Sequence, residues 1–167
     1  MPTLFDSPVV VEGVAPAHIL ADINKVADFM YAGNAVFTVR GQETGTRFTF
    51  KVQKAKPNPN YAPRDAWFVK VLTGPDNTSS YSYMGMITAA PDLLKTKSFR
   101  FTGASRISKS ATSAKAFLYC LDHLENRKQY PPKVDIWHAG HCGRCNRLLT
   151  VGDSIERGFG KVCLSKM

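Results

Sequence analysis

The spacing of hydrophobic and polar positions changes between residues 16 and 52, which predicts a helix followed by a β-hairpin. Apolar side chains first recur at the spacing of one helical face, at Ile19, Ile23, Val26 and Met30. Pro16 suits the first turn of this helix, which we expect to end near Gly33. The period then becomes two, with Phe48, Phe50 and Val52 alternating with Arg47, Thr49 and Lys51. Residues 36–40 are the expected partner strand, and Gly45 lies in the turn between the two.

Three further segments extend this hairpin into a sheet. Residues 66–72 and 81–87 have the composition of strands, and residues 99–101 are expected to add a short fifth one. Four or five strands after one helix predict a small twisted sheet or half-open barrel. A second amphipathic helix is predicted from Ser113 onward by Ala114, Phe117, Leu118, Leu121 and Leu124. We expect residues 17–126 to form one core.

A stiff connector, Pro131-Pro132, ends the second helix and marks the predicted domain boundary. The sequence thus predicts a core domain over residues 1–130 and a metal-binding module over residues 131–167. The expected fold class is α+β, with a small antiparallel, half-barrel-like sheet, two amphipathic helices and a C-terminal zinc-ribbon-like module.

The module is predicted from one run of thiol and imidazole side chains, His138-x3-Cys142-x2-Cys145-x17-Cys163. Two thiolates separated by two residues face one ion from a tight turn, and a distant third closes a loop around it. Structural zinc takes four ligands, so we expect Zn²⁺ at His138, Cys142, Cys145 and Cys163. His141, a side chain elsewhere such as His123, or water are the alternatives for the fourth position.

Two other interpretations of the cysteines are less favoured. Reduced cysteines need bind no metal, and a Cys-x2-Cys pair also occurs in redox proteins, but there it starts a helix after a strand in a βαβ unit, which this segment lacks. Cys120 falls within the second predicted helix, outside the metal spacing. We expect it to be a small buried apolar residue.

The same residues carry a family resemblance. Cys142-Gly-Arg-Cys-Asn-Arg-Leu-Leu-Thr150, followed by Ser154-Ile155, Gly158-Phe-Gly160 and Cys163, resembles an uncharacterised zinc-ribbon-like domain common in bacteriophage and prophage proteins. Two positions depart from its pattern, Asn146 for glycine and Lys161 for proline. Asparagine tolerates a left-handed turn, so the turn between the cysteines should survive. The preceding β-rich region is also similar to what often precedes this domain. The resemblance implies a phage or mobile-element origin and no activity.

The net charge is divided unevenly along the chain. Residues 1–94 carry 8 Lys+Arg and 8 Asp+Glu, while residues 95–167 carry 14 and 5, so the whole excess of +9 lies in the second part. Clustered cations favour a polyanionic partner, although many soluble proteins are basic only for solubility. The expected phosphate contacts are Lys95, Lys97, Arg100, Arg106, Lys109, Arg144, Arg147, Arg157 and Lys161. Four strand aromatics, Phe99, Phe101, Tyr81 and Tyr83, would stack on single-stranded bases if they were exposed, but strand aromatics more often belong to the core.

No catalytic constellation accompanies these features. Carboxylates are scattered singly in the first part, and no nucleophile or phosphate-loop motif occurs, so we predict no enzyme activity. The first residues lack the pattern of a secretory signal and no apolar run approaches about 18 residues, so we expect a cytoplasmic protein, in the host cell if phage-encoded, and no membrane partner. The first functional hypothesis is an accessory protein that binds DNA or RNA. The second is an anti-defence protein that binds a host protein, ribonucleoprotein or nuclease complex, and the third is a purely structural interaction module.

Overall fold

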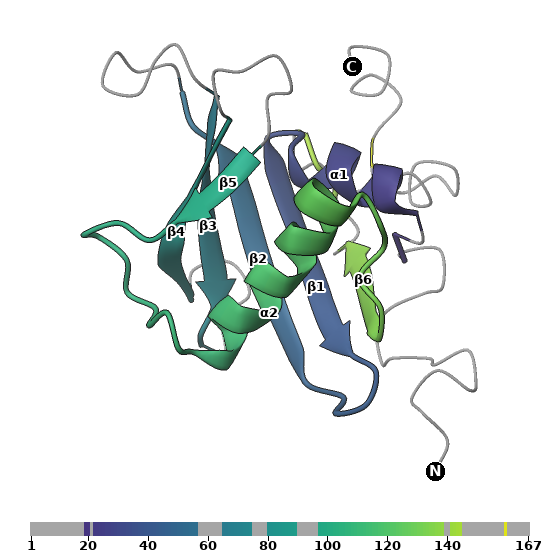
Figure 1. The fold of residues 1–167 in the computed structure, drawn as a ribbon. Coiled ribbons are helices and arrows are strands. Elements are labelled where there is room, and N and C mark those ends of the chain that lie inside the picture. Colours follow the sequence, from purple (N-terminus) through teal and green to yellow (C-terminus); the bar gives the residue numbers. More distant parts are fainter. Residues whose placement is uncertain are drawn as a thin grey trace.

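The fold is built on one antiparallel sheet whose six strands run in the order β5-β4-β3-β2-β1-β6 (Figure 1). The computed structural model of the chain describes residues 19–20, 22–56, 65–74, 80–89, 97–138, 141–144 and 159. The strands are β1 (Asn34–Gly41), β2 (Arg47–Lys54), β3 (Ala66–Leu72), β4 (Tyr81–Ala89), β5 (Lys97–Arg100) and β6 (Val134–His138). The helical elements are α1 (Ile23–Met30), α2 (Thr112–Asp122) and the π-helical turn η2 (His123–Arg127) that continues α2. The α+β class and the half-barrel shape of the sheet are confirmed.

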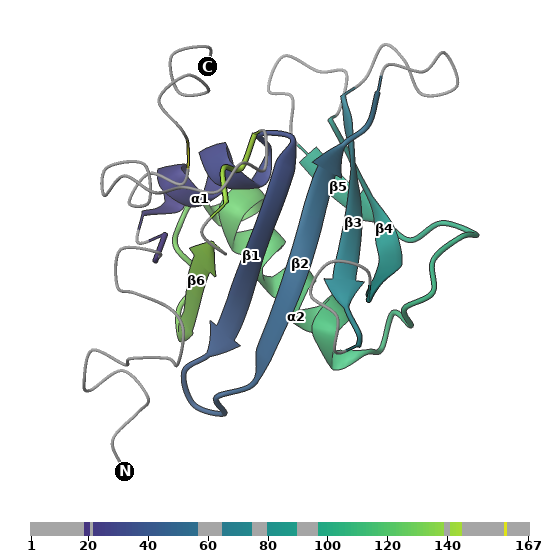
Figure 2. The same cartoon turned by 180° about the vertical axis from the view of Figure 1, so that it is seen from behind.

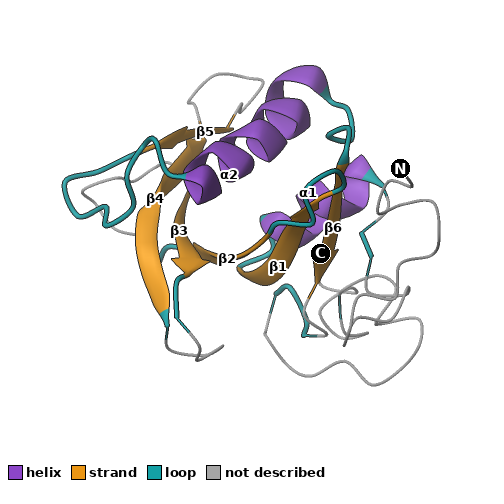
Figure 3. Cartoon of the chain, turned by 90° about the horizontal axis from the view of Figure 1, so that it is seen from below, coloured by secondary structure: helices purple, strands orange, loops and turns teal. Residues whose placement is uncertain are grey.

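Helix α2 lies in the concave side of the curved sheet and closes the main core (Figure 3). Phe117 of α2 is fully buried, and its ring centroid lies 5.1 Å from that of Phe50 in β2 and 5.6 Å from that of Phe99 in β5. Alternate residues of the central strands, such as Val52 and Val69, are buried on the same side. The period-two pattern of β2 therefore points its apolar residues at the helix, as alternation requires.

The β1–β2 hairpin that the sequence pattern predicts is present in the structure. Phe37 pairs with Phe50, Val39 with Phe48, and Thr38 with Thr49 across the two strands. Gly45 adopts φ +70° in the connecting turn, a left-handed conformation that glycine enters without a steric penalty. The N–H of Gly45 donates to the carbonyl of Gly41 over 2.9 Å, which closes the turn.

Gly85 in β4 is required by a close approach between strands rather than by a turn. A β-carbon built on Gly85 would lie 2.3 Å from Cζ of Phe99 and 2.6 Å from the carbonyl oxygen of Arg100. The register of β3 and β4 shifts beside it, between Val69 and Lys70. The absent side chain thus lets Phe99 reach Phe117 of α2 across the sheet.

Helix α1 begins later than its sequence pattern predicts. Asp22 caps it, because its carboxylate accepts the N–H of Asn24 over 2.6 Å, and the helix starts at Ile23. Ile19 instead forms an antiparallel bridge with Trp137, and the N–H of Leu20 donates to the carbonyl of Ile136 over 2.8 Å. The expectation that Ile19 belongs to the helix is therefore wrong, because backbone pairing with β6 holds this segment extended.

Strand β6 is the element that the sequence analysis did not predict. It pairs antiparallel with β1 from Val134 opposite Gly41 to His138 opposite Phe37. Its side chain Ile136 is 1% exposed and belongs to the core cluster. The start of the segment assigned to the C-terminal module is therefore an edge strand of the main sheet. The domain boundary itself stays a prediction, because most of residues 139–167 lie outside the described ranges.

In the portion of the chain that the structure describes, neither helix has the length or the apolar character needed to cross a bilayer.

Candidate metal centre

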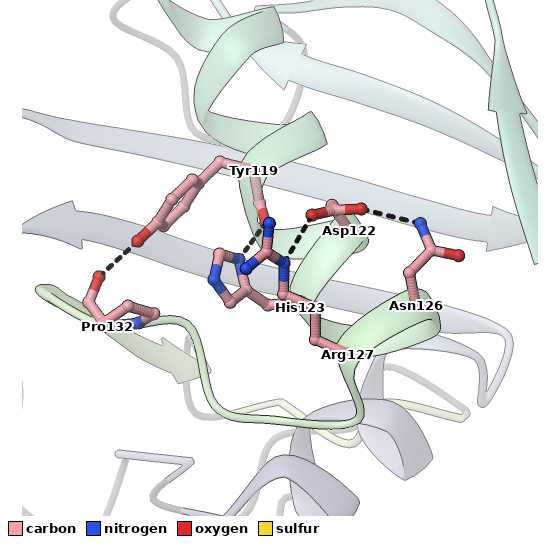
Figure 4. A network of polar contacts seen from close by, with 6 residues as sticks. All are labelled: Tyr119, Asp122, His123, Asn126, Arg127 and Pro132. Atoms are coloured by element: carbon pink, nitrogen blue, oxygen red, sulfur yellow. Dashed lines mark hydrogen bonds and ion pairs between the residues drawn. The ribbon is translucent and has the colours of Figure 1, made fainter.

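A polar network between the end of α2 and the start of β6 sets the path of the chain toward the candidate centre (Figure 4). The hydroxyl of Tyr119 donates to the carbonyl of Pro132 over 2.8 Å, and Nδ1 of His123 donates to the carbonyl of Tyr119 over 2.9 Å. Asp122 accepts from Asn126 over 2.7 Å and from Arg127 over 3.1 Å, which lowers the pKa of its carboxyl. The contact between Tyr119 and Pro132 ties the connector to α2, and the other contacts lie within α2 and η2.

His138 ends β6 on the inward side of the sheet. Val134, Ile136 and His138 alternate with Asp135 and Trp137, so the imidazole takes the third inward position of this strand. The side chain of His138 is 0% exposed, and its ring centroid lies 5.5 Å from that of Phe29 in α1. A fully buried imidazole at this position suits a ligand that is held rigidly by the fold.

The first part of the Cys-x2-Cys turn is fastened to the start of β1 by Asn34. The backbone N–H of Asn34 donates to the carbonyl of Gly143 over 2.7 Å, and its side-chain Nδ2 donates to the carbonyl of Arg144 over 2.7 Å. Cys142 is 0% exposed and belongs to the core cluster. The turn is therefore docked on the sheet by two hydrogen bonds and by burial of its first cysteine.

Gly143 allows this docking because the ring of Phe29 occupies the space of its absent side chain. A β-carbon at Gly143 would lie 2.6 Å from Cδ2 of Phe29 and 3.1 Å from Cε1 of Phe159. Phe159 is itself 4% exposed, and its ring centroid lies 5.9 Å from that of Phe29. One phenyl ring from α1 thus contacts the imidazole of His138, the turn and Phe159.

The structure places two of the four predicted ligands, His138 and Cys142, in buried positions around Phe29. Cys145 and Cys163 lie outside the described residues, and within those residues no group of three or more His, Cys, Asp or Glu side chains is placed to hold a metal ion. The complete ligand set therefore stays a prediction. The donor chemistry of the two buried residues, an imidazole and a thiol, suits zinc.

The matched segment of a known family begins at the first of these ligands. Residues 138–167 match DUF6011, a family of unknown function. This DUF6011 segment spans His138, Cys142, Cys145 and Cys163, and it leaves both helices and every strand residue except His138 outside the match. No curated protein and no solved structure matches the chain. The family match carries no activity, and the predicted division of the chain at residue 131 stays a prediction.

The alternatives for the fourth ligand differ in burial and position. His141, inside the DUF6011 segment, is half-buried, whereas His138 is fully buried. His123 lies outside the segment, and its Nδ1 forms a hydrogen bond with the carbonyl of Tyr119 in the preceding turn of α2. Cys120 of α2 is 2% exposed, and burial raises the pKa of its thiol to about 12. The expectation that Cys120 is a small buried core residue is confirmed.

The predicted phosphate contacts do not all share one face. Lys97 packs inward, with its Nζ 4.5 Å from the ring centroid of Tyr31 and 5.8 Å from that of Trp67. Arg100, three residues along β5, is exposed on the opposite face of the sheet. The others are placed as follows: Arg106 and Lys109 exposed on the loop after β5, Arg144 half-buried beside the DUF6011 segment's first cysteine, and Lys95, Arg147, Arg157 and Lys161 outside the described residues.

Asn34 and Phe29 are the residues of this centre that sequence reasoning missed. Both precede the DUF6011 segment by more than a hundred positions, and their contacts depend on the pairing of β1 with β6. Asn34 follows Gly33, which has φ +135°, so a signal for a special backbone position was present in the sequence. Nothing in the sequence pointed to its partner.

Proposed function

We propose that this protein binds nucleic acid as a non-catalytic accessory factor and holds one structural zinc ion in its C-terminal segment. The observation that carries the first part is the confinement of the whole net charge of +9 to residues 95–167. Arg100, Arg106 and Lys109 support it, because all three are exposed and none takes part in an ion pair with another described residue. Exposed cations of this kind gain free energy by displacing counterions from phosphates.

The second part of the proposal assigns the zinc ligands. His138, Cys142, Cys145 and Cys163 would hold the ion, which would fold the C-terminal segment around it and leave no open position for substrate. The burial of His138 and Cys142 supports this set, and the half-buried His141 is the weaker choice. Zinc would therefore fix the cations of this segment in one arrangement rather than activate water.

Metal analysis of the purified protein tests the zinc assignment. We expect one equivalent of zinc per chain, and we expect Cys142→Ser and Cys163→Ser to lose it, because zinc binding contributes on the order of 10 kcal/mol to the folding of small modules. Cys120→Ser is the matched control, since Cys120 is buried like Cys142 but lies outside the metal spacing, and this variant should keep its zinc. Full metal content in both ligand variants would contradict the assignment.

Salt dependence of binding tests the nucleic-acid assignment. Roughly four to six phosphate contacts predict a slope near −3 to −5 in a plot of log affinity against log salt concentration. Replacing Arg144, Arg147 and Arg157 together with glutamine should flatten this slope and leave zinc content unchanged. A wild-type protein that binds neither DNA nor RNA at about 50 mM salt would exclude this function. A host protein or nuclease complex, bound in an anti-defence role, would then take its place.

A further inference from the structure

The convex face of the sheet, opposite α2, is not covered by either of the two described helices along β1 to β4 (Figure 2). The alternation along each strand assigns side chains to this face. Phe50 and Val52 of β2 enter the core, so Thr49 and Lys51 point the other way. The cross-strand register then identifies their neighbours on the adjoining strands.

Cations dominate this face. The positively charged side chains that the register places on it come from four strands: Arg40 of β1, Arg47 and Lys51 of β2, Lys70 of β3 and Arg100 of β5. Asp135 of β6, opposite Arg40, is the sole carboxylate among the described strand residues. The first 94 residues have no net charge, and yet the fold sorts several of their cations onto one surface.

Two pairs of like charges lie directly opposite each other on this face. Lys51 is the cross-strand partner of Lys70, and Arg40 is the partner of Arg47. Such pairs destabilise a sheet. Asp135, opposite Arg40 on its other side, attracts that guanidinium, whereas no ion pair within the described ranges relieves Lys51 and Lys70. The guanidinium of Arg40 is also buried, and its Nε and Nη1 have no hydrogen-bond acceptor there. The attraction of a bound polyanion for these cations would offset the repulsion between them.

Aromatic rings lie among these cations. Tyr83 is the cross-strand partner of Lys70, and the Nζ of Lys51 lies 5.3 Å from the ring centroid of Tyr81. Phe68 of β3 adds a third ring, whose centroid lies 6.1 Å from that of Tyr83. All three rings are half-buried, so part of each is exposed to solvent. Rings interleaved with cations on a sheet provide stacking surfaces for bases and charges for the connecting phosphates.

We propose that this convex face binds single-stranded nucleic acid, with Lys51 and Lys70 contacting phosphates and Tyr81 stacking on a base. The proposal rests on the proposed function and adds to it the surface and the form of the ligand. Single strands fit because their bases are free to stack on side chains, whereas the bases of a duplex already stack on each other. Its lysines are different residues from the arginines proposed in the C-terminal segment, so the two sets can be substituted independently.

Binding of a fluorescein-labelled oligothymidylate of about 20 nucleotides, compared with its duplex, tests the proposal by fluorescence anisotropy. The test variant is Lys51→Gln/Lys70→Gln, and the matched control is Lys25→Gln/Lys115→Gln, which removes the same charge from exposed positions on α1 and α2. We expect the test variant to weaken single-strand binding about tenfold and to reduce the salt slope by about 1.4, because each phosphate contact on a single strand contributes about 0.7. The control should leave the slope unchanged.

Tyr81→Leu separates stacking from charge. It should weaken binding about fivefold or more without changing the salt slope, since the lost contact is with a base. Melting temperatures of all variants should stay close to that of the wild type. Equal affinity of the wild type for duplex, or unchanged binding by both the lysine and the tyrosine variants, would overturn the proposal. If only the triple arginine variant of the C-terminal segment lost affinity, the proposed function would stand and the proposal for this face would fail. A wild type that binds no nucleic acid would overturn both proposals.

Discussion

Replacing Gly143 by alanine should destabilise the protein through one specific collision. The added β-carbon would lie 2.6 Å from Cδ2 and 2.8 Å from Cε2 of Phe29, whereas two carbons pack best at about 3.5–4.0 Å. The ring would have to move by about 1 Å, but it is 1% exposed and lies between His138 and Phe159. The turn cannot retreat either, because Asn34 holds the carbonyls of Gly143 and Arg144.

Overpacking of this kind costs about 1–3 kcal/mol, and a value near 2 kcal/mol corresponds to a fall in melting temperature of about 4–8 °C for a chain of this size. Thermal unfolding followed by circular dichroism measures this fall. Gly103→Ala is the matched control, because a β-carbon there meets nothing within 4 Å and should leave the melting temperature nearly unchanged.

A double-mutant cycle identifies the colliding partner. Combining Gly143→Ala with Phe29→Leu should cost less than the sum of the two single changes by about 1 kcal/mol or more, because leucine removes the ring atoms that the new methyl group meets. If Gly143→Ala has the same melting temperature as the wild type, or if the effects of the two substitutions are additive, the contact between this ring and the turn does not act as described.

The remaining predictions concern the sheet and the ligands. His138→Ala should lower zinc affinity in a competition assay with a chelating dye more than His141→Ala, and the reverse order would make His141 the ligand. A chain that ends at Tyr130 lacks β6 and should lose cooperative melting. A chain that ends after His138 keeps all six strands and should melt cooperatively. Equal melting of the two chains would contradict the expectation that β6 stabilises the sheet. Gly85→Ala should lower the melting temperature by at least as much as Gly143→Ala, since its β-carbon would meet the backbone oxygen of Arg100 at 2.6 Å, and an unchanged value would refute the close approach.

Local patterns sufficed to predict the strands that pair with their neighbours in sequence. The alternation in β2 and the turn at Gly45 define the first hairpin without reference to the rest of the chain. Strand β6 was missed because Trp137 and His138 interrupt its apolar alternation, and its partner β1 lies about a hundred residues earlier. The start of α1 was misplaced for a related reason, since Ile19 has helical spacing but pairs with Trp137.

The two candidate sites also differ in how far the sequence predicts them. The spacing of the cysteines is a local signal, and it led to Cys142 and His138, which the fold buries. The net charge indicates a basic region at residues 95–167 and gives no indication of Lys51 and Lys70, because acidic residues cancel the positive charges in the net charge of residues 1–94. Only the register of β2 and β3 shows that these two lysines are neighbours.

The strand order implies a sequence of events in folding. Strands β1 to β5 form a meander in which every strand pairs with the next one along the chain, so each pairing closes a loop of at most 11 residues, and residues 42–133 separate β1 from β6. Strand β6 must instead cross back to β1 after α2 has been made. During synthesis, β1 therefore has an unpaired edge until the ribosome has released residues 134–138. His138 reaches its buried position only at that moment, so burial of this imidazole marks the completion of the sheet.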